Sequence, residues 1–137
     1  MDRRPNRRTA IDRDSRQRRG IGELTSRKAI SGNRCMLSLK GELKHGNADD
    51  LYQEVIQLFE SGATELVLDF RELTYCDTTG LQSLVRIYKY VQEYSNFSFT
   101  ILVHEDELNN ILRTCRFDKF MKITHDESIA AGDWRQV

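Results

Sequence analysis

Residues 66–80 read LVLDFRELTYCDTTG, and they combine an apolar strand with the start of a helix. The stretch opens with an apolar run, Leu66 to Phe70, of the kind found in strands that are covered on both faces. It ends in Asp77-Thr78-Thr79-Gly80, and a strongly periodic helix follows. A strand that leads through a short loop into a helix N-terminus presents free backbone N–H groups, here beside two hydroxyls. This arrangement suits an anion, or a hydroxyl that is to become one.

The neighbouring segments extend the pattern in both directions. Two strands are expected between residues 24 and 41. In the second, the inner residues Cys35, Leu37 and Leu39 alternate with Met36, Ser38 and Lys40, as in a half-buried strand. A helix capped by Asn47 runs to about Ser61, and Gly62 follows it. After the strand at 66–70 we expect a loop over 71–77 and a helix from Thr78 or Thr79. A strand at 97–103, a third helix with an inner apolar stripe ending at Cys115, and a strand near 121–123 should follow.

This order of elements predicts a single α/β domain. Its mixed sheet should have four to five strands, packed with three to four helices. At 137 residues, the chain has room for one sizeable core. We place the domain at residues 23–131 and a polar C-terminal tail at 132–137.

The N-terminal segment differs sharply from the domain in charge. Residues 1–34 hold 11 Lys or Arg against 4 Asp or Glu, whereas residues 35–137 hold 10 against 17. Residues 1–22 carry eight arginines and almost no apolar side chains, so we expect a disordered basic arm. The arm is either a solvated tail or an electrostatic contact for nucleic acid, acidic lipid or an acidic partner. It could equally lie on its own acidic domain. It lacks the interleaved aromatics that stack on bases.

Several classes of protein are disfavoured by composition. No apolar run approaches the roughly 20 residues of a membrane span, and the N-terminus does not resemble a secretory signal. Three cysteines without CxxC spacing favour a reducing cytoplasm over a disulfide framework. The three histidines, at 45, 104 and 125, show no metal-ligand spacing. We therefore expect neither a metal nor a cofactor.

Three segments resemble the STAS domain family. They are Gly41-Glu42-Leu43 after an early strand, LVLDFRELTYCDTTGLQSL from residue 66, and RTCRFDKFMKI from residue 113. The resemblance covers about residues 35–125 and is strongest to the bacterial anti-sigma factor antagonists. Its most specific element is Asp77, two hydroxyl residues, Gly80 and Leu81 after an apolar strand.

The resemblance implies a regulatory role by partner switching, with no enzymatic activity. In such antagonists the first hydroxyl residue after the Asp, here Thr78, is phosphorylated by an anti-sigma factor that is also a Ser/Thr kinase. A metal-dependent phosphatase removes the phosphate. The unphosphorylated form binds the anti-sigma factor and frees a sigma factor, for example in a stress response, without itself binding nucleic acid. The implied partner-binding residues are Gly41, Glu42, His45, Asp77, Thr79, Gly80 and Leu81.

The sequence departs from the family pattern at three places, and other functions stay open. The acceptor is Thr where Ser is commoner, Cys76 replaces a larger aliphatic residue, and the basic arm is an addition. One alternative is a non-switched STAS scaffold subunit of a stressosome-like or lipid-transport complex. Another is an enzyme or small-ligand site at the Asp77 loop. A simpler interpretation is that one threonine is an ordinary helix cap. The cysteines are most simply small buried hydrophobic residues, and redox sensing at Cys76, with a thiol pKa lowered by the helix start, is the alternative.

Overall fold

The structure is a computed structural model that describes residues 24–137. The basic arm predicted at residues 1–22 lies outside the described residues.

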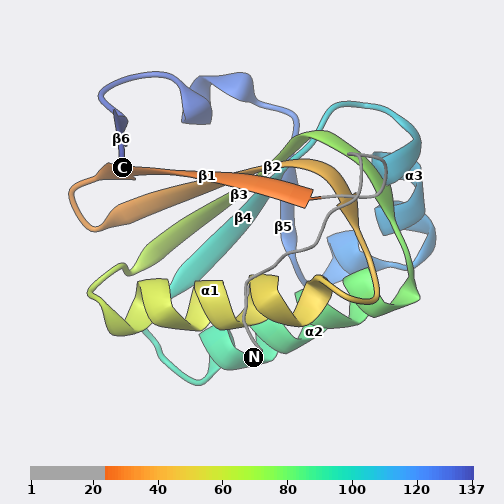
Figure 1. The fold of residues 1–137 in the computed structure, drawn as a ribbon, viewed down its shortest axis with the longest axis horizontal. Helices are drawn as coiled ribbons and strands as arrows, with labels where there is room; N and C mark the ends of the chain where they lie inside the picture. The colour runs from red at the N-terminus through yellow and green to blue at the C-terminus, as the bar shows by residue number, and fades with distance from the viewer. Residues whose placement is uncertain (1–23) are drawn as a thin grey trace, which may run out of the picture.

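A six-stranded mixed sheet forms the centre of the domain, in the order β5-β4-β3-β2-β1-β6 (Figure 1). Strands β2 to β5 run parallel, and β1 and β6 are each antiparallel to their neighbours. The α/β class and the three α-helices confirm the prediction, but the sheet has one strand more than expected. The elements are β1 (Leu24–Ser31), β2 (Arg34–Leu43), α1 (Ala48–Glu60), β3 (Glu65–Cys76), α2 (Thr78–Gln92), β4 (Ser98–Leu102), α3 (Glu107–Thr114), η1 (Phe117–Lys119), β5 (Lys122–Thr124), η2 (Glu127–Ala130) and β6 (Arg135–Gln136).

Strand β3 is longer than its apolar run, so the predicted loop at 71–77 is wrong. The polar residues Arg71, Glu72 and Thr74 made this segment look like a loop. In the structure β3 stays paired with β2 as far as Cys76, through two register shifts in the ladder. Leu73 and Cys76 are buried. The strand therefore delivers the chain directly to the start of α2.

The main core lies between the sheet and the helices. Alternating side chains of the central strands, such as Leu37 and Leu68, pack against α1 and α2, which lie side by side on this face (Figure 1). The predicted inner position of Cys115 is wrong, because α3 ends at Thr114 and the Cys115 side chain is exposed.

The other face of the sheet is partly covered by the C-terminal segment (Figure 1). Met36 and Val67 belong to a second, smaller apolar cluster, against which Ile129 and Trp134 pack. Met36, expected on the solvent side of its strand, is thus buried. The polar end of the chain returns to the sheet as β6, which no apolar pattern in the sequence signalled.

A buried ion pair anchors the same segment to the sheet. The carboxylate of Asp69, which is 7% exposed, accepts hydrogen bonds from the Arg71 guanidinium at 2.9 and 3.0 Å. Arg71 reaches on to Glu127 of η2 at 2.8 Å. Burial opposes the charge of Asp69, but hydrogen bonds from Arg71 outweigh it and hold the pKa of this carboxyl below its ordinary value.

Candidate functional site

The candidate site lies where the parallel strands β2 and β3 end. In α/β sheets, the loops after the carboxyl ends of the strands are the usual place for binding sites. Here the loop after β2 and the start of α2 are held together by two hydrogen bonds. The Asp77 N–H donates to the carbonyl of Leu43 at 3.1 Å, and the His45 N–H donates to Asp77 Oδ2 at 3.0 Å.

Asp77 is the residue that caps α2. It has an extended backbone, and its Oδ1 accepts a hydrogen bond from the Gly80 N–H at 2.8 Å. The expectation that a threonine caps this helix is therefore wrong. Asp and Thr are both good caps. Asp77 is the cap because the helical backbone angles begin at the next residue, Thr78. The cap leaves both threonine hydroxyls out of this role.

The carboxylate of Asp77 is held in its charged form. The His45 backbone N–H is the largest cause, and it is helped by hydrogen bonds from the N–H groups of Gly80 and Thr79. Together they lower the pKa of Asp77 below its ordinary value, against a smaller opposing effect of desolvation. Asp77 thus accepts protons poorly, which argues against a general base.

Thr78 and Thr79 differ in exposure. Thr78 is the first residue of α2 and is exposed, whereas Thr79 is half-buried. A side chain at the first helical position projects from the helix end, where the backbone dipoles favour negative charge. Of the two hydroxyls, the one on Thr78 is the more open to a modifying enzyme.

Gly80 is buried and makes its close contacts within the domain. A Cβ added there would lie 2.7 Å from the Leu43 carbonyl oxygen and 2.8 Å from Cys76 Sγ. The missing side chain therefore lets the first turn of α2 approach the end of β2. Gly80, one of the partner-binding residues that the family resemblance implies, is therefore covered by Leu43 and Cys76.

The other predicted site residues occupy two kinds of position. Gly41 and Glu42 belong to β2 rather than to a loop, and the Glu42 carboxylate pairs with Lys44 Nζ at 3.0 Å. His45 is exposed beside Asp77, whereas Leu81 is half-buried against the core. The structure therefore brings His45, Asp77 and the start of α2 together most closely.

Asn47 orders the loop after β2 in an unexpected way. It stands at the N-cap position of α1, but no cap hydrogen bond comes from its side chain. Its Oδ1 instead accepts from the Lys44 N–H, and its Nδ2 donates to the Glu42 carbonyl, both at 2.9 Å. These bonds fold residues 42–47 into a tight loop, which fixes the His45 N–H toward Asp77.

Cys76 is a core residue and not a reactive thiol. Burial is the main cause that raises its pKa to about 12, and the Asp77 charge adds to the shift. The expectation that the helix start would lower this pKa is wrong, because the side chain points under the helix.

Tyr75 is a surface residue near the candidate site that no sequence pattern singled out. It is 49% exposed and pairs with Glu42 across the β2–β3 ladder, three residues before Thr78. Aromatic side chains of this kind are enriched in protein interfaces. The signal was present in the sequence, but the loop predicted over 71–77 concealed which side chains would point outward.

Comparison with known proteins identifies the family. The family model described as "Mlab, STAS domain" matches residues 26–124. The chain belongs to the STAS domain family. No curated protein matches it significantly in sequence.

Solved structures share the fold of this STAS domain at low sequence identity. An anti-sigma factor antagonist from Mycobacterium paratuberculosis matches with a TM-score of 0.70 at 17% identity, over 80% of this chain and 93% of its own. The anti-sigma factor antagonist SpoIIAA in its unphosphorylated form matches with a TM-score of 0.64 at 14% identity, over 77% of this chain and 93% of its own. The phosphorylated form of SpoIIAA, a Bacillus cell fate determinant, matches with a TM-score of 0.57 at 12% identity, over 77% of this chain and 96% of its own.

The described residues contain no group of three His, Cys, Asp or Glu side chains placed to hold a metal ion. None of the helices over residues 24–137 is long and apolar enough to cross a membrane.

Proposed function

We propose that this STAS domain is an anti-sigma factor antagonist switched by phosphorylation of Thr78. The observation that carries the proposal is the arrangement at the start of α2. Asp77 caps the helix, and the exposed Thr78 hydroxyl is left without a structural role in the cap. Solved antagonists with this fold, SpoIIAA in phosphorylated and unphosphorylated forms among them, support the same assignment.

The proposed covalent step is an ordinary phosphoryl transfer. The kinase, which is the partner anti-sigma factor, moves the γ-phosphoryl group of ATP to Thr78 Oγ1, and ADP and a proton are released. A metal-dependent phosphatase restores the hydroxyl with water and releases inorganic phosphate. The STAS domain itself acts as substrate and binding module, with no catalytic group of its own.

Electrostatics explains how the modification would switch binding. A phosphate adds about 1.5 to 2 negative charges at neutral pH, directly beside a carboxylate whose lowered pKa keeps it charged. The helix end stabilises such charge by about 0.3–1 kcal/mol, so the fold should survive the modification. A partner surface packed against this loop would meet two adjacent anionic groups and would be repelled.

The partner surface should include the residues around Thr78 that reach solvent. We assign to it His45, Asp77, Thr79 and the newly recognised Tyr75, with Gly41, Glu42 and Leu81 at its margin. Gly80 supports this surface from below, since it is buried. Binding would release a sigma factor from the same anti-sigma factor in the cytoplasm, with no contact between this domain and DNA.

The decisive experiment compares phosphorylated and unmodified protein for binding to the cognate anti-sigma kinase. The unmodified protein and Thr78→Ala should bind alike, and phosphorylation should weaken binding by at least about tenfold, equivalent to about 1.4 kcal/mol. Thr79→Ala is the matched control and should still be phosphorylated and released. Thr78→Glu should be a partial mimic, because a carboxylate carries about half the charge of a phosphate.

Two results would contradict the proposal. One is equal affinity of the phosphorylated and unmodified forms. The other is a phosphate that maps outside the segment from Asp77 to Gly80. The first result would favour the alternative of a non-switched scaffold subunit, and the second would mean that the start of α2 is only a helix cap.

A further inference from the structure

A groove runs between β1 and α1, on the helix side of the sheet. Three adjacent hollows of about 370, 330 and 130 Å³ line up along it. The first and second share Lys28 and Leu58, and the first and third share Asp50 and Glu54, so together they form one continuous depression. We call it the β1–α1 groove. Its walls come from β1 residues such as Leu24 and Lys28, and from α1 residues 50–61.

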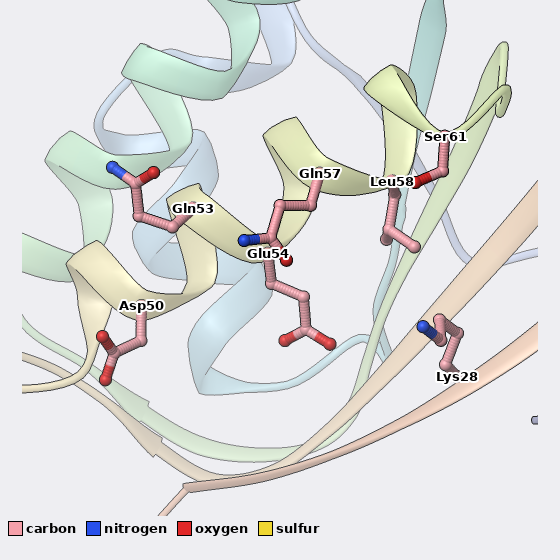
Figure 2. A pocket seen from close by; sticks show the side chains of 7 residues that line it. All are labelled: Lys28, Asp50, Gln53, Glu54, Gln57, Leu58 and Ser61. Atoms are coloured by element: carbon pink, nitrogen blue, oxygen red, sulfur yellow. The ribbon is translucent and has the colours of Figure 1, made fainter. Parts of the chain in front are cut away.

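The α1 wall of this groove is acidic and partly desolvated. Figure 2 shows Asp50 and Glu54 on successive turns of the helix, with the Glu54 carboxylate directed into the space in front of β1. Burial raises the pKa of both carboxyls, and Asp49 adds to the shift at Asp50. Lys28 across the groove and a 3.5 Å hydrogen bond from Ser26 offset only part of the effect at Glu54. The wall is therefore well suited to a further positive charge.

Apolar side chains line both ends of the groove. Leu24 and Leu39 lie at one end, and Leu58 and Ile30 lie at the other. A ligand with aliphatic stems and cationic ends suits both surfaces, and arginine is such a side chain. Its guanidinium also forms stronger, two-pronged contacts with carboxylates than an ammonium does.

We propose that residues 13–19 of this same chain, with Arg13, Arg16, Arg18 and Arg19, bind in the β1–α1 groove. This segment lies outside the described residues, but its point of attachment is known. Strand β1 begins at Leu24, which lines one end of the groove. Gly20 and Gly22 stand between the arginines and that point, and glycine readily permits the reversal of direction that is needed.

Length and charge both agree with this occupant. Residues 13–19 extended would span roughly 23 Å, about the length of β1 from Leu24 to Ile30 at 3.3 Å per residue. Residues 1–23 hold 8 basic against 4 acidic side chains, and residues 24–137 hold 13 against 17, so the segment before β1 complements the domain in charge. The groove also touches Asn47, the last residue of the loop that carries His45. The bound arm would thus lie beside the candidate site, although the proposal does not rest on phosphorylation of Thr78.

Limited digestion of the full chain with trypsin tests this directly. Cleavage after Arg13, Arg16, Arg18 and Arg19 is followed by mass spectrometry and compared with a free peptide of residues 1–23. At about 0.1 M salt we expect these bonds to be cut about tenfold more slowly in the protein, since cleavage follows the population of the unbound arm. Cleavage after Arg7 and Arg8 should match the peptide. Near 1 M salt, where screening acts within about 3 Å, the protection should fade.

Paired variants separate groove binding from simple proximity to the domain. Asp50→Asn with Glu54→Gln should speed cleavage severalfold at low salt. Glu93→Gln, at the C-cap of α2, with Glu107→Gln, in α3, changes the net charge equally and should behave as the wild type. Equal cleavage rates in wild type and the Asp50/Glu54 variant would overturn the proposal. Protection that grows with protein concentration would also overturn it, because the arm would then occupy a second copy.

A second measurement guards against misfolding of the groove variant. In full-length protein with Arg13, Arg16, Arg18 and Arg19 all changed to Gln, the domain sequence is untouched. Hydrogen exchange over residues 49–61 should be faster than in the wild type at low salt and equal at high salt. Unchanged exchange at low salt would reject the groove as the binding place.

Discussion

At the scale of single residues, Asp77 combines two tasks in one carboxylate. One oxygen caps α2 through Gly80, and the other ties down the loop after β2 through the His45 N–H. The sequence predicted that one of the two threonines caps this helix, but the cap is Asp77. Asp and Thr are both good caps, and only the backbone angles around these three residues decide which one serves.

Replacement of Asp77 should separate its hydrogen bonding from its charge. Asp77→Ala should lower the free energy of unfolding by about 1–2 kcal/mol, because the cap and the loop contact are both lost. Asp77→Asn, the matched control, still accepts hydrogen bonds and should lose only about 0.5 kcal/mol. Urea unfolding at neutral pH measures both. Equal stability of the Ala and Asn variants would show that the cap contributes nothing.

The same pair of proteins has a defined dependence on pH. The folded-state pKa of Asp77 is lowered, so its charge stabilises the fold above the unfolded pKa of about 3.9 and loses this effect as pH falls through the folded value. Unfolding energies of wild type and Asp77→Asn should therefore converge as the pH drops below about 4. A constant difference down to acid pH would contradict the assigned hydrogen bonds.

At the scale of secondary structure, β3 shows where sequence patterns succeed and fail. Its first half, Leu66 to Phe70, is buried throughout and was predicted correctly. Its second half carries Arg71 and Glu72, which look like loop residues when only hydropathy is considered. They are strand residues because β3 stays paired with β2 as far as Cys76. The Arg71 guanidinium is satisfied by Asp69, two residues away, and by Glu127 of η2. The pairing with β2 and the contact with Glu127 join segments far apart in the chain, so they leave no local trace in the sequence.

Loss of Arg71 should cost far more than loss of a nearby surface arginine. Arg71→Met leaves the Asp69 carboxylate buried with Ser38 as its remaining side-chain partner, and we expect about 2–4 kcal/mol less stability. The control is Arg27→Met, since Arg27 pairs with Glu72 at 3.9 Å while the two side chains are 70% and 59% exposed. That change should cost at most about 0.5 kcal/mol. Similar losses in the two variants, measured by urea unfolding, would refute a special role for the buried pair.

At the scale of the whole molecule, the sheet is covered unequally on its two faces. The cover on the helix side of the sheet was predictable, because apolar residues with a helical period indicate the buried faces of α1 and α2. The opposite cover was not, because it is built from a few scattered side chains, Ile129, Ala130 and Trp134, in a polar segment. The proximity of Thr78 to Asp77 could be predicted from adjacent positions, whereas the placement of Tyr75 and the His45 backbone beside them depends on how β2 and β3 end together.

We expect the C-terminal segment, including the tail at residues 132–137, to detach before the domain unfolds. Trp134 is the single tryptophan of the chain, so its fluorescence reports on this segment alone. Its indole N–H donates to the Ile129 carbonyl at 3.1 Å, and the Arg34 guanidinium lies 4.7 Å from the ring centre. Few apolar contacts hold the segment, and regions of this kind open at lower free energy than the core.

Urea unfolding followed in two ways distinguishes segment from core. The fluorescence transition of Trp134 should have a lower midpoint than the far-ultraviolet circular dichroism transition, which follows the helices. Arg71→Met should widen the gap, because it removes the 2.8 Å contact between Arg71 and Glu127 that fastens η2. Arg27→Met should leave the gap unchanged, since Arg27 pairs with β3 and not with η2. If both signals changed together in all three proteins, the segment would be an integral part of one cooperative unit, and the open face of the sheet would be covered as firmly as the helical face.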